Sequence, residues 1–140
     1  MNKIGVMQGR LLPKYQGRYQ AHPVGYWQDE FTVAKDLGLD CIEFILDYND
    51  VEDNPLLKKG GVDGIKAIVE KTGVNVNTIC ADYFMEAPLH SEDSKVANFS
   101  QQLMVRLLNS VVELGVISGL QQLGYAFPGQ RLNLCSLGPR

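Results

Sequence analysis

The feature that most constrains the fold is a junction that occurs three times along the chain. A segment with helical periodicity ends at a glycine and an apolar run follows, at Leu37-Gly38-Leu39, Thr72-Gly73-Val74 and Leu114-Gly115-Val116. Glycine accepts the positive φ that often ends a helix, because it has no Cβ to clash. The apolar runs begin at Ile4, Ile42, Val76 and Val116, so successive runs start 38, 34 and 40 residues apart. This alternation predicts βαβ units around a parallel sheet.

The hydrophobic pattern places three strands and three helices between these junctions. Apolar runs predict strands over 3–7, 41–46 and 75–80, which we expect to pair in parallel in that order. Apolar residues at helical spacing predict helices over 27–37, 62–72 and 96–114. Their buried faces include Phe31, Ala34 and Leu37 in the first helix and Phe99, Leu103 and Leu107 in the third. Residues 14–25 have no period and are predicted to form a long loop.

Length and composition narrow the class of protein. The chain has 140 residues, the size of one ordinary domain, and a formal net charge of −3. That charge disfavours nucleic-acid binding through phosphate contacts, and no apolar run reaches the roughly 18 residues of a membrane span. The cysteines Cys41, Cys80 and Cys135 are odd in number and widely spaced, which favours a reducing cytoplasm over a disulfide framework. We therefore expect a cytoplasmic protein that binds neither nucleic acid nor membranes.

The composition changes abruptly after Glu113. All sixteen acidic residues precede that point, and residues 115–140 carry only Arg131 and Arg140 as charges. The same 26 residues contain five glycines, two prolines and three glutamines, with no helical face and no clear fourth strand. We therefore divide the chain into a domain over 1–116 and an irregular or frameshifted tail over 117–140. A divergent C-terminal cap is the alternative interpretation of the tail.

Three segments resemble the xylose-isomerase-like barrel family. The run from Phe31 to Phe44, FTVAKDLGLDCIEF, resembles that family's first helix end and second strand. The opening KIGVMQGRL resembles its first strand and loop, and residues 72–82 resemble its second helix end and third strand. The resemblance covers residues 1–116. It implies that the chain forms the first half of an eight-stranded parallel TIM (β/α)₈ barrel.

The same resemblance implies a function. Members of the family are sugar or sugar-phosphate isomerases and epimerases, which move a proton next to a carbonyl with a divalent metal such as Mn, Mg or Zn. Their metal ligands lie on later strands, and no Asp, Glu or His occurs at or after Val116 in this chain. We therefore expect no metal or other cofactor in this chain and no activity of the chain alone. The alternatives are a non-catalytic fragment or interaction module, an abasic-site endonuclease-like branch of the same fold, and a small open α/β domain.

Candidate substrate-binding residues lie where predicted strands end, because active sites of parallel barrels gather at the carboxyl ends of their strands. These candidates are Gln8, Arg10, Glu43, Asp82 and Tyr83. Glu43 is notable, because a carboxylate inside an apolar run needs a partner or a watery pocket. We interpret the acidic residues from Asp47 to Asp53 as a solvated loop, and His22 and His90 as surface loop residues.

The expected partners are a small sugar or sugar phosphate and a second copy of the chain. Half of a barrel leaves two sheet edges open, and open edges favour pairing with another chain. The outer flanks of the first and third predicted helices would also stay partly uncovered, and the third helix is the worse case because of Phe99, Leu103 and Leu107. We therefore expect self-association unless the tail folds over the open edge.

Overall fold

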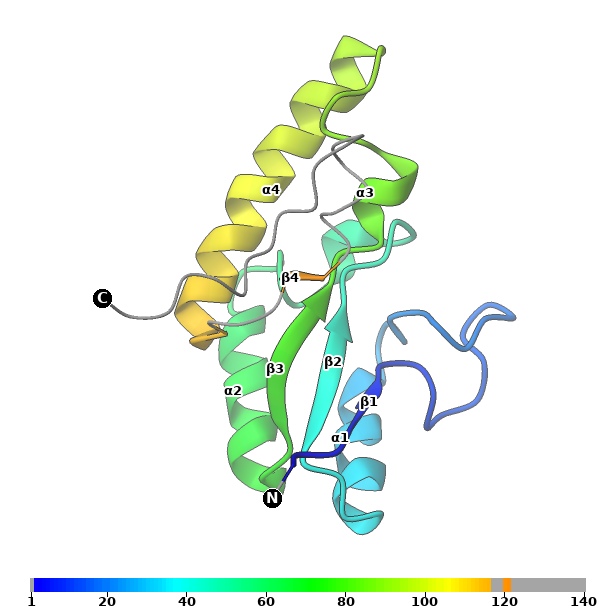
Figure 1. Ribbon diagram of the computed structural model, residues 1–140, viewed down its shortest axis with the longest axis vertical. Coiled ribbons are helices and arrows are strands. Elements are labelled where there is room, and N and C mark those ends of the chain that lie inside the picture. The colour runs from blue at the N-terminus through cyan, green and yellow to red at the C-terminus, as the bar shows by residue number, and fades with distance from the viewer. Residues whose placement is uncertain (1, 117–119, 122–140) are drawn as a thin grey trace.

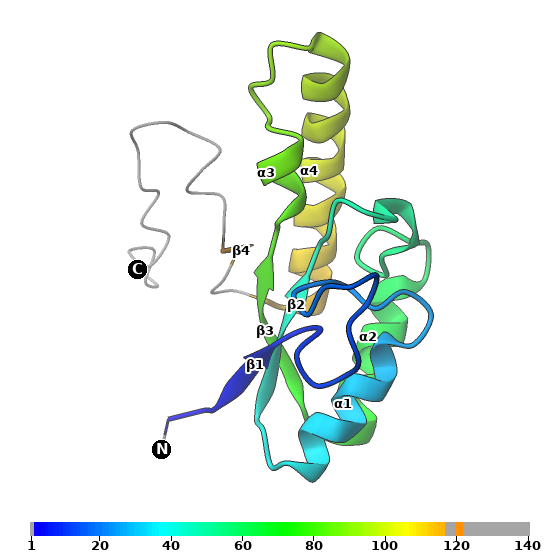
Figure 2. The ribbon, with the colours of Figure 1, turned by 90° about the vertical axis from the view of Figure 1, so that its right-hand side faces the viewer.

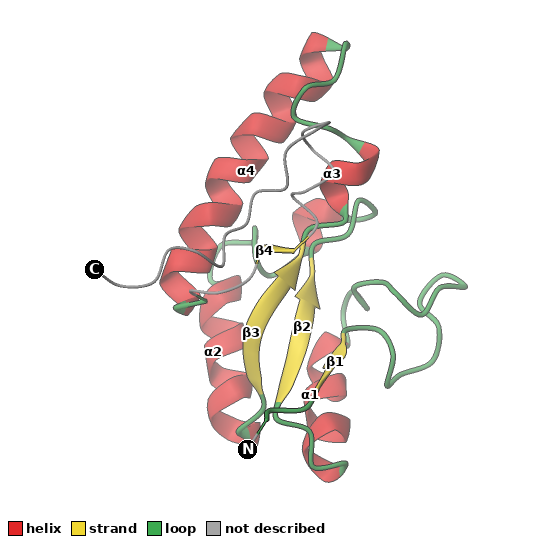
Figure 3. Cartoon of the chain, viewed as in Figure 1, coloured by secondary structure: helices red, strands yellow, loops and turns green. Residues whose placement is uncertain are grey.

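The computed structural model describes residues 2–116 and 120–121 (Figure 1). The elements, drawn by type in Figure 3, are β1 (Gly5–Met7), α1 (Trp27–Asp36), β2 (Cys41–Ile45), the 3-10 helix η1 (Val51–Asp53), α2 (Gly61–Thr72), β3 (Asn75–Cys80), α3 (Tyr83–Glu86), α4 (Ser94–Leu114) and β4 (Leu120–Gln121). None of the helices in this described part is both long enough and apolar enough to cross a membrane.

The sheet confirms the predicted strand order and direction. Its order is β1-β2-β3-β4, and every pairing is parallel. The register pairs Val6 with Ile42 and Ile42 with Val76, and a β-bulge follows Ile42 where β2 meets β3. The short β4 pairs with the last two residues of β3, a fourth strand that the sequence pattern did not indicate. The rest of the predicted tail over 117–140 lies outside the described residues.

The helices α1, α2 and α4 lie together on one side of the sheet, as Figure 2 shows. Side chains alternate along a strand, so Ile42 and Phe44 turn toward these helices while Cys41 and Glu43 turn to the opposite face. Phe44 packs against Trp27 and Phe31 of α1. The covered face holds the core, which includes Phe31, Ala34, Ile42, Phe44, Ile65, Ile79, Leu103 and Leu107.

The ends of the helices follow the predicted chemistry. Gly38, Gly73 and Gly115 all have positive φ, between 71° and 76°, where each predicted helix was expected to stop. Asp93 precedes α4 and its carboxylate accepts a hydrogen bond from the backbone N–H of Lys95, which is an N-cap contact.

Two predicted core residues are exposed instead. Leu37 is 63% exposed: it is the C-cap of α1 and follows the last buried residue of that helix, Ala34, at the solvent-exposed end. Phe99 is 45% exposed near the start of α4, where it lines a cavity and does not reach the core. The four-residue helix α3 was also not expected, because it lies in the segment after β3 that has no helical period.

Candidate functional site

The carboxyl ends of β2 and β3 border a polar cavity of about 450 Å³. The cavity is lined by Arg18, Gln20, Asp47, Tyr48, Asn49, Asp82, Met85 and Glu86. Arg18 and Gln20 come from the long loop between β1 and α1, which lies beside β1 in Figure 1 and reaches the strand ends through hydrogen bonds to Asp47 and Asp82. Three segments far apart in the sequence therefore supply side chains to one site, at the edge where parallel sheets usually bind ligands.

Asp47 and Arg18 form the main ion pair of the cavity. The Arg18 guanidinium donates to both carboxylate oxygens of Asp47, at 2.8 and 3.4 Å. Asp47 is buried, whereas the Arg18 side chain remains 42% exposed. Asp47 is thus not part of a solvated loop, and that interpretation was wrong for this residue. The sequence offers no sign that the β1–α1 loop would bring an arginine to it.

Asp82 lies at the other side of the cavity, just beyond β3. Its Oδ2 accepts a hydrogen bond from the side-chain amide of Gln20 at 3.1 Å, and its Oδ1 accepts one from the Cys80 thiol at 3.1 Å. Burial raises the pKa of the Cys80 thiol, and the carboxylates of Asp82 and Glu43 raise it further. Cys80 is therefore a protonated hydrogen-bond donor that holds Asp82, not a thiolate nucleophile.

Gln8, which follows β1, forms a buried pair with His22. The Gln8 side chain accepts a hydrogen bond from the backbone N–H of Ile45 at 3.0 Å, and His22 Nδ1 lies 3.1 Å from the same oxygen. Burial lowers the pKa of His22 to about 4, although the charge of Asp47 acts in the opposite direction. His22 was interpreted as a surface residue, and that interpretation was wrong because its ring packs beside Phe44.

Glu30 positions the start of the β1–α1 loop. Its buried carboxylate accepts hydrogen bonds from the backbone N–H groups of Gly9 and Leu11, at 2.9 and 3.1 Å. Burial raises the pKa of Glu30, and the backbone N–H groups of residues 9, 10 and 11 partly oppose that shift. The sequence placed Glu30 in the first turn of a helix, and that position gave no sign that it binds a loop.

Glu43 lies on the sheet face that the helices leave uncovered. It lines a small cavity of about 200 Å³ with Gly5, Val6, Met7, Cys41 and Thr78. In the part of the chain that the structure describes, no lysine, arginine or histidine forms an ion pair with it. Glu43 is half-buried, so water reaches its carboxylate, and its charge is felt by Cys80.

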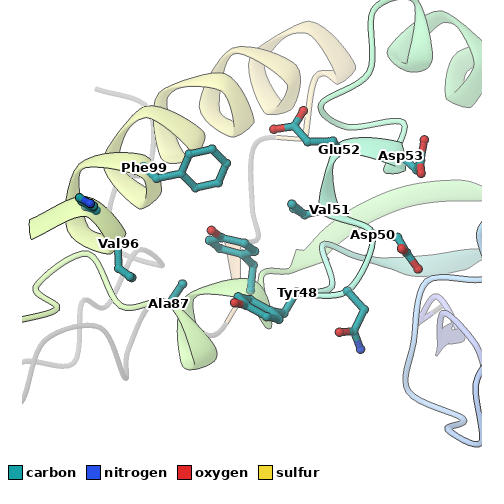
Figure 4. A pocket seen from close by; sticks show the side chains of 11 residues that line it. Tyr48, Asp50, Val51, Glu52, Asp53, Ala87, Val96 and Phe99 are labelled. Atoms are coloured by element: carbon teal, nitrogen blue, oxygen red, sulfur yellow. The ribbon is translucent and has the colours of Figure 1, made fainter. Parts of the chain in front are cut away.

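Tyr83 belongs to a second cavity, of about 630 Å³, shown in Figure 4. Its ring stacks on Tyr48, with 5.4 Å between the ring centroids. Phe99 of α4 lies across from this aromatic pair, and the Glu52 side chain extends toward the same space (Figure 4). Tyr48 lines both cavities, so the two cavities adjoin.

The five residues proposed from the sequence therefore do not form one cluster. Asp82 lines the polar cavity, Tyr83 the aromatic cavity and Glu43 the uncovered sheet face. Gln8 is buried, and Arg10 is exposed on the turn that Glu30 holds. Sequence analysis missed Arg18 and Gln20 because they lie in a loop without period.

The described residues do not provide a ready-made metal centre. Within residues 2–116 and 120–121, no three His, Cys, Asp or Glu side chains are placed together as ligands for one ion. The donor set that the family resemblance implied therefore does not fit this part of the chain, and we derive no catalytic step through a metal.

Comparisons with known proteins give two relatives. No family model matches the chain. Over 117 residues, the chain is 32% identical to the UlaE protein of Shigella dysenteriae serotype 1 (strain Sd197). It is 30% identical over 117 residues to the L-ribulose-5-phosphate 3-epimerase UlaE of Salmonella heidelberg (strain SL476). Each match covers 81% of this chain but only 40% of the relative. The chain is thus similar to less than half of a sugar-phosphate epimerase.

Proposed function

We propose that this chain derives from the sugar-phosphate isomerase and epimerase lineage and binds a sugar phosphate at the polar cavity. The similarity to UlaE over most of the chain carries the proposal. The resemblance of residues 31–44 to xylose-isomerase-like barrels supports the same lineage. In this proposal, the parallel sheet with helices on one face is the first half of a (β/α)₈ barrel, and the uncovered face is the barrel interior.

The cavity has the chemistry that a polyol phosphate requires. The carboxylates of Asp47 and Asp82 can accept hydrogen bonds from sugar hydroxyls, and the half-exposed guanidinium of Arg18 can donate to hydroxyls or to a phosphate. Gln20 and Cys80 hold Asp82 in place, so its orientation is set before a ligand arrives. Epimerisation is a proton transfer next to a carbonyl, and Glu43 lines a separate cavity on the uncovered face, so it would hold such a proton only for a ligand that extends from the polar cavity onto that face.

We further propose that the 140-residue chain binds the sugar phosphate without epimerising it. The chain matches only 40% of the length of each relative, and its described residues include no group of three His, Cys, Asp or Glu side chains that could hold one metal ion. A cytoplasmic location agrees with sugar-phosphate chemistry and with the wide spacing of the three cysteines.

Titration of the ¹⁵N-labelled chain with L-ribulose 5-phosphate tests binding. Shifts should concentrate in residues 18–20, 47–49 and 82–86, and Asp82→Asn should weaken binding about tenfold or more, the usual loss for a charged hydrogen bond to a ligand. Lys66→Gln is the control, because Lys66 forms an exposed ion pair with Glu113 and neither residue lines the cavity. Shifts confined to other regions, or an unchanged affinity in Asp82→Asn, would contradict the site.

A second measurement tests turnover. The chain and L-ribulose 5-phosphate are incubated in D₂O with Mn²⁺, and the sugar is analysed for deuterium at the carbon next to the carbonyl. The proposal expects no exchange above the protein-free rate. Exchange that disappears in Glu43→Gln would instead show that the chain is an active epimerase by itself.

A further inference from the structure

The aromatic cavity collects aromatic side chains from three different parts of the chain. Tyr48 follows β2, Tyr83 begins α3 and Phe99 belongs to α4, and all three line the same cavity of about 630 Å³. Only 4% of Tyr83 is exposed, whereas Tyr48 and Phe99 remain 49% and 45% exposed. Two large aromatic residues thus keep much of their surface open at one concave site, and such surface often marks a binding site.

Aromatic faces border this cavity on two sides. The Tyr48 and Tyr83 rings stack at an interplanar angle of 30°, with 5.4 Å between their centroids, and together form one broad wall. The Phe99 ring extends toward the cavity from α4, across from Tyr48 (Figure 4). A planar ring between these walls would meet aromatic surface on both of its faces. Such ring–ring packing favours an aromatic ligand over a saturated one of the same size, because it adds to the burial of apolar area.

Hydrogen bonds tie two sides of the cavity to α4. Arg106 donates to both carboxylate oxygens of Glu52 at 2.8 Å, which joins the segment after Tyr48 to α4. The buried Ser100 hydroxyl donates to the backbone carbonyl oxygen of Ala87 at 2.9 Å, which joins the end of α3 to the same helix. The walls are therefore in place before a ligand arrives, which reduces the ordering cost of binding.

The charges around the cavity balance. Its lining contains three carboxylates and one ammonium group, which belong to Asp50, Glu52, Asp53 and Lys95. Arg106 pairs with Glu52 and Lys58 pairs with Asp53, so three cationic groups stand beside three carboxylates. This balance favours neither an anion nor a cation in the cavity. We therefore expect a neutral occupant, unlike the sugar phosphate proposed for the polar cavity.

We propose that the aromatic cavity binds the ring of a neutral aromatic molecule, which packs between the Tyr48–Tyr83 pair and Phe99. The cavity volume is well above the roughly 150 Å³ that encloses a benzene ring, and it lies in the range of about 300–1,000 Å³ typical of ligand cavities. Tyr48 and Asn49 line both this cavity and the polar cavity, so the two ligands would bind side by side. The proposal concerns a second ligand and does not rest on the proposed function.

Phenol and cyclohexanol are matched probes, because they have the same heavy atoms and differ in aromaticity. Each is titrated at millimolar concentrations into the full ¹³C,¹⁵N-labelled chain without sugar phosphate. Phenol should shift the signals of Val51, Ala87 and Val96, show nuclear Overhauser contacts to the Phe99 ring, and bind about threefold more tightly than cyclohexanol or better. Equal affinities of the two probes, or no phenol-dependent shift at these residues, would overturn the proposal.

Phe99→Ala removes one aromatic wall and should weaken phenol binding about threefold or more. Phe99 is half-exposed, so its truncation should leave the fold intact. Leu108→Ala is the matched control, because Leu108 is a similarly exposed apolar residue of α4 that does not line the cavity. An unchanged phenol affinity in Phe99→Ala would contradict the site. If Phe99→Ala does not fold, the contacts of phenol and the comparison of the two probes in the unmodified chain decide.

The outcomes separate this proposal from the proposed function, because phenol is titrated without sugar phosphate. Phenol binding in a chain that does not bind L-ribulose 5-phosphate would support the aromatic site and oppose the proposed function. Binding of L-ribulose 5-phosphate in a chain that does not bind phenol would support the proposed function and overturn the aromatic site.

Discussion

Arg18 and Asp47, which are 29 residues apart in the sequence, are joined by two hydrogen bonds in which one guanidinium donates to both oxygens of one carboxylate. This contact ties the β1–α1 loop to the end of β2. Because Asp47 is buried and Arg18 is half-exposed, the two residues lose different amounts of solvation on folding. We therefore expect substitutions of Arg18 and of Asp47 to lower the free energy of unfolding by different amounts.

Arg18→Gln should lower the free energy of unfolding by about 1–3 kcal/mol, because it leaves the Asp47 carboxylate buried with its charge unpaired. Asp47→Asn should cost less, since the exposed arginine regains water. The double variant should resemble Asp47→Asn alone. Urea unfolding of the two single variants and the double variant forms a complete cycle. Strictly additive losses would show that the pair is not energetically coupled.

The exposed ion pair between Lys58 and Asp53 is the control for this double-mutant cycle. They form a 3.4 Å ion pair in which both side chains are more than half exposed. Exposed pairs contribute about 0–1 kcal/mol, so Lys58→Gln should leave the unfolding free energy almost unchanged.

The repeated junctions made the fold predictable, because a glycine ends a helix through its own backbone conformation and not through distant contacts. Gly38, Gly73 and Gly115 need only their own backbone conformation to do this, and the hydrophobic pattern between them shows which residues face the core. The strand order followed from the same pattern. The third helix was placed within two residues of its observed start and at its observed end, Leu114.

The candidate site was only partly predictable, because its residues meet through a loop. The pairs Arg18 with Asp47 and Gln20 with Asp82 span 29 and 62 residues. Such contacts depend on the tertiary path of residues 8–26, which has no hydrophobic period. His22 was misplaced for the same reason: a single histidine in a polar loop gives no sign that two aromatic rings will bury it.

Gly9→Ala should be strongly destabilising. Gly9 has a φ of +85°, and an added Cβ would lie 2.1 Å from the carbonyl oxygen of Tyr19 and 2.5 Å from that of Ala21. The loop must therefore move away from β1, which costs more than the roughly 1 kcal/mol of left-handed strain alone. We expect a loss of about 2–4 kcal/mol in urea unfolding and weaker sugar-phosphate binding.

Gly17→Ala is the matched control for this substitution. Gly17 has a similar φ of +79°, but an added Cβ would meet no atom within 4 Å. Gly17→Ala should lower the free energy of unfolding only by the cost of a left-handed backbone, about 1 kcal/mol. Equal losses of unfolding free energy in Gly9→Ala and Gly17→Ala would show that the close contact of Gly9 with Tyr19 and Ala21 does not cause the destabilisation.

His22 should make the protein less stable as the pH falls from about 6.5 toward 4. The unfolded chain binds a proton near the ordinary histidine value of 6.5, whereas burial holds the pKa of folded His22 at about 4. The unfolded state therefore binds more protons in this window, and the contribution to stability is lost as the pH falls. The full shift corresponds to at most about 3 kcal/mol.

Unfolding free energies of the parent chain and of His22→Phe, measured between pH 7 and 4.5, check this dependence. The slope should flatten in His22→Phe, because the titrating group is gone. His90→Phe should retain the parent slope, since His90 is exposed. An unchanged slope in His22→Phe would mean that other groups cause the acid sensitivity.

Self-association remains a proposal, but the structure changes the residues that would carry it. Leu103 and Leu107 were expected to contribute to an uncovered flank, yet both are buried in the core. The apolar residues that α4 exposes are Val105, Leu108 and Val112, at 59%, 43% and 80%. Their spacing of three and four places them on one side of the helix. This stripe offers a second copy an apolar surface, and the outer edge of β1, which no other described strand pairs with, offers it backbone groups.

Analytical ultracentrifugation of the 140-residue chain at micromolar concentrations tests this proposal. We expect a concentration-dependent dimer, because burying about 400 Å² of apolar surface favours association by roughly 10 kcal/mol before the entropy of association is subtracted. The double substitution Val105→Lys and Val112→Lys should shift the equilibrium to monomer, since it places charges in the stripe. Leu37→Lys adds a charge at a similarly exposed leucine, the C-cap of α1, and should leave the dimer intact. A parent chain that sediments as a monomer, with a melting temperature independent of concentration, would rule out association through this surface.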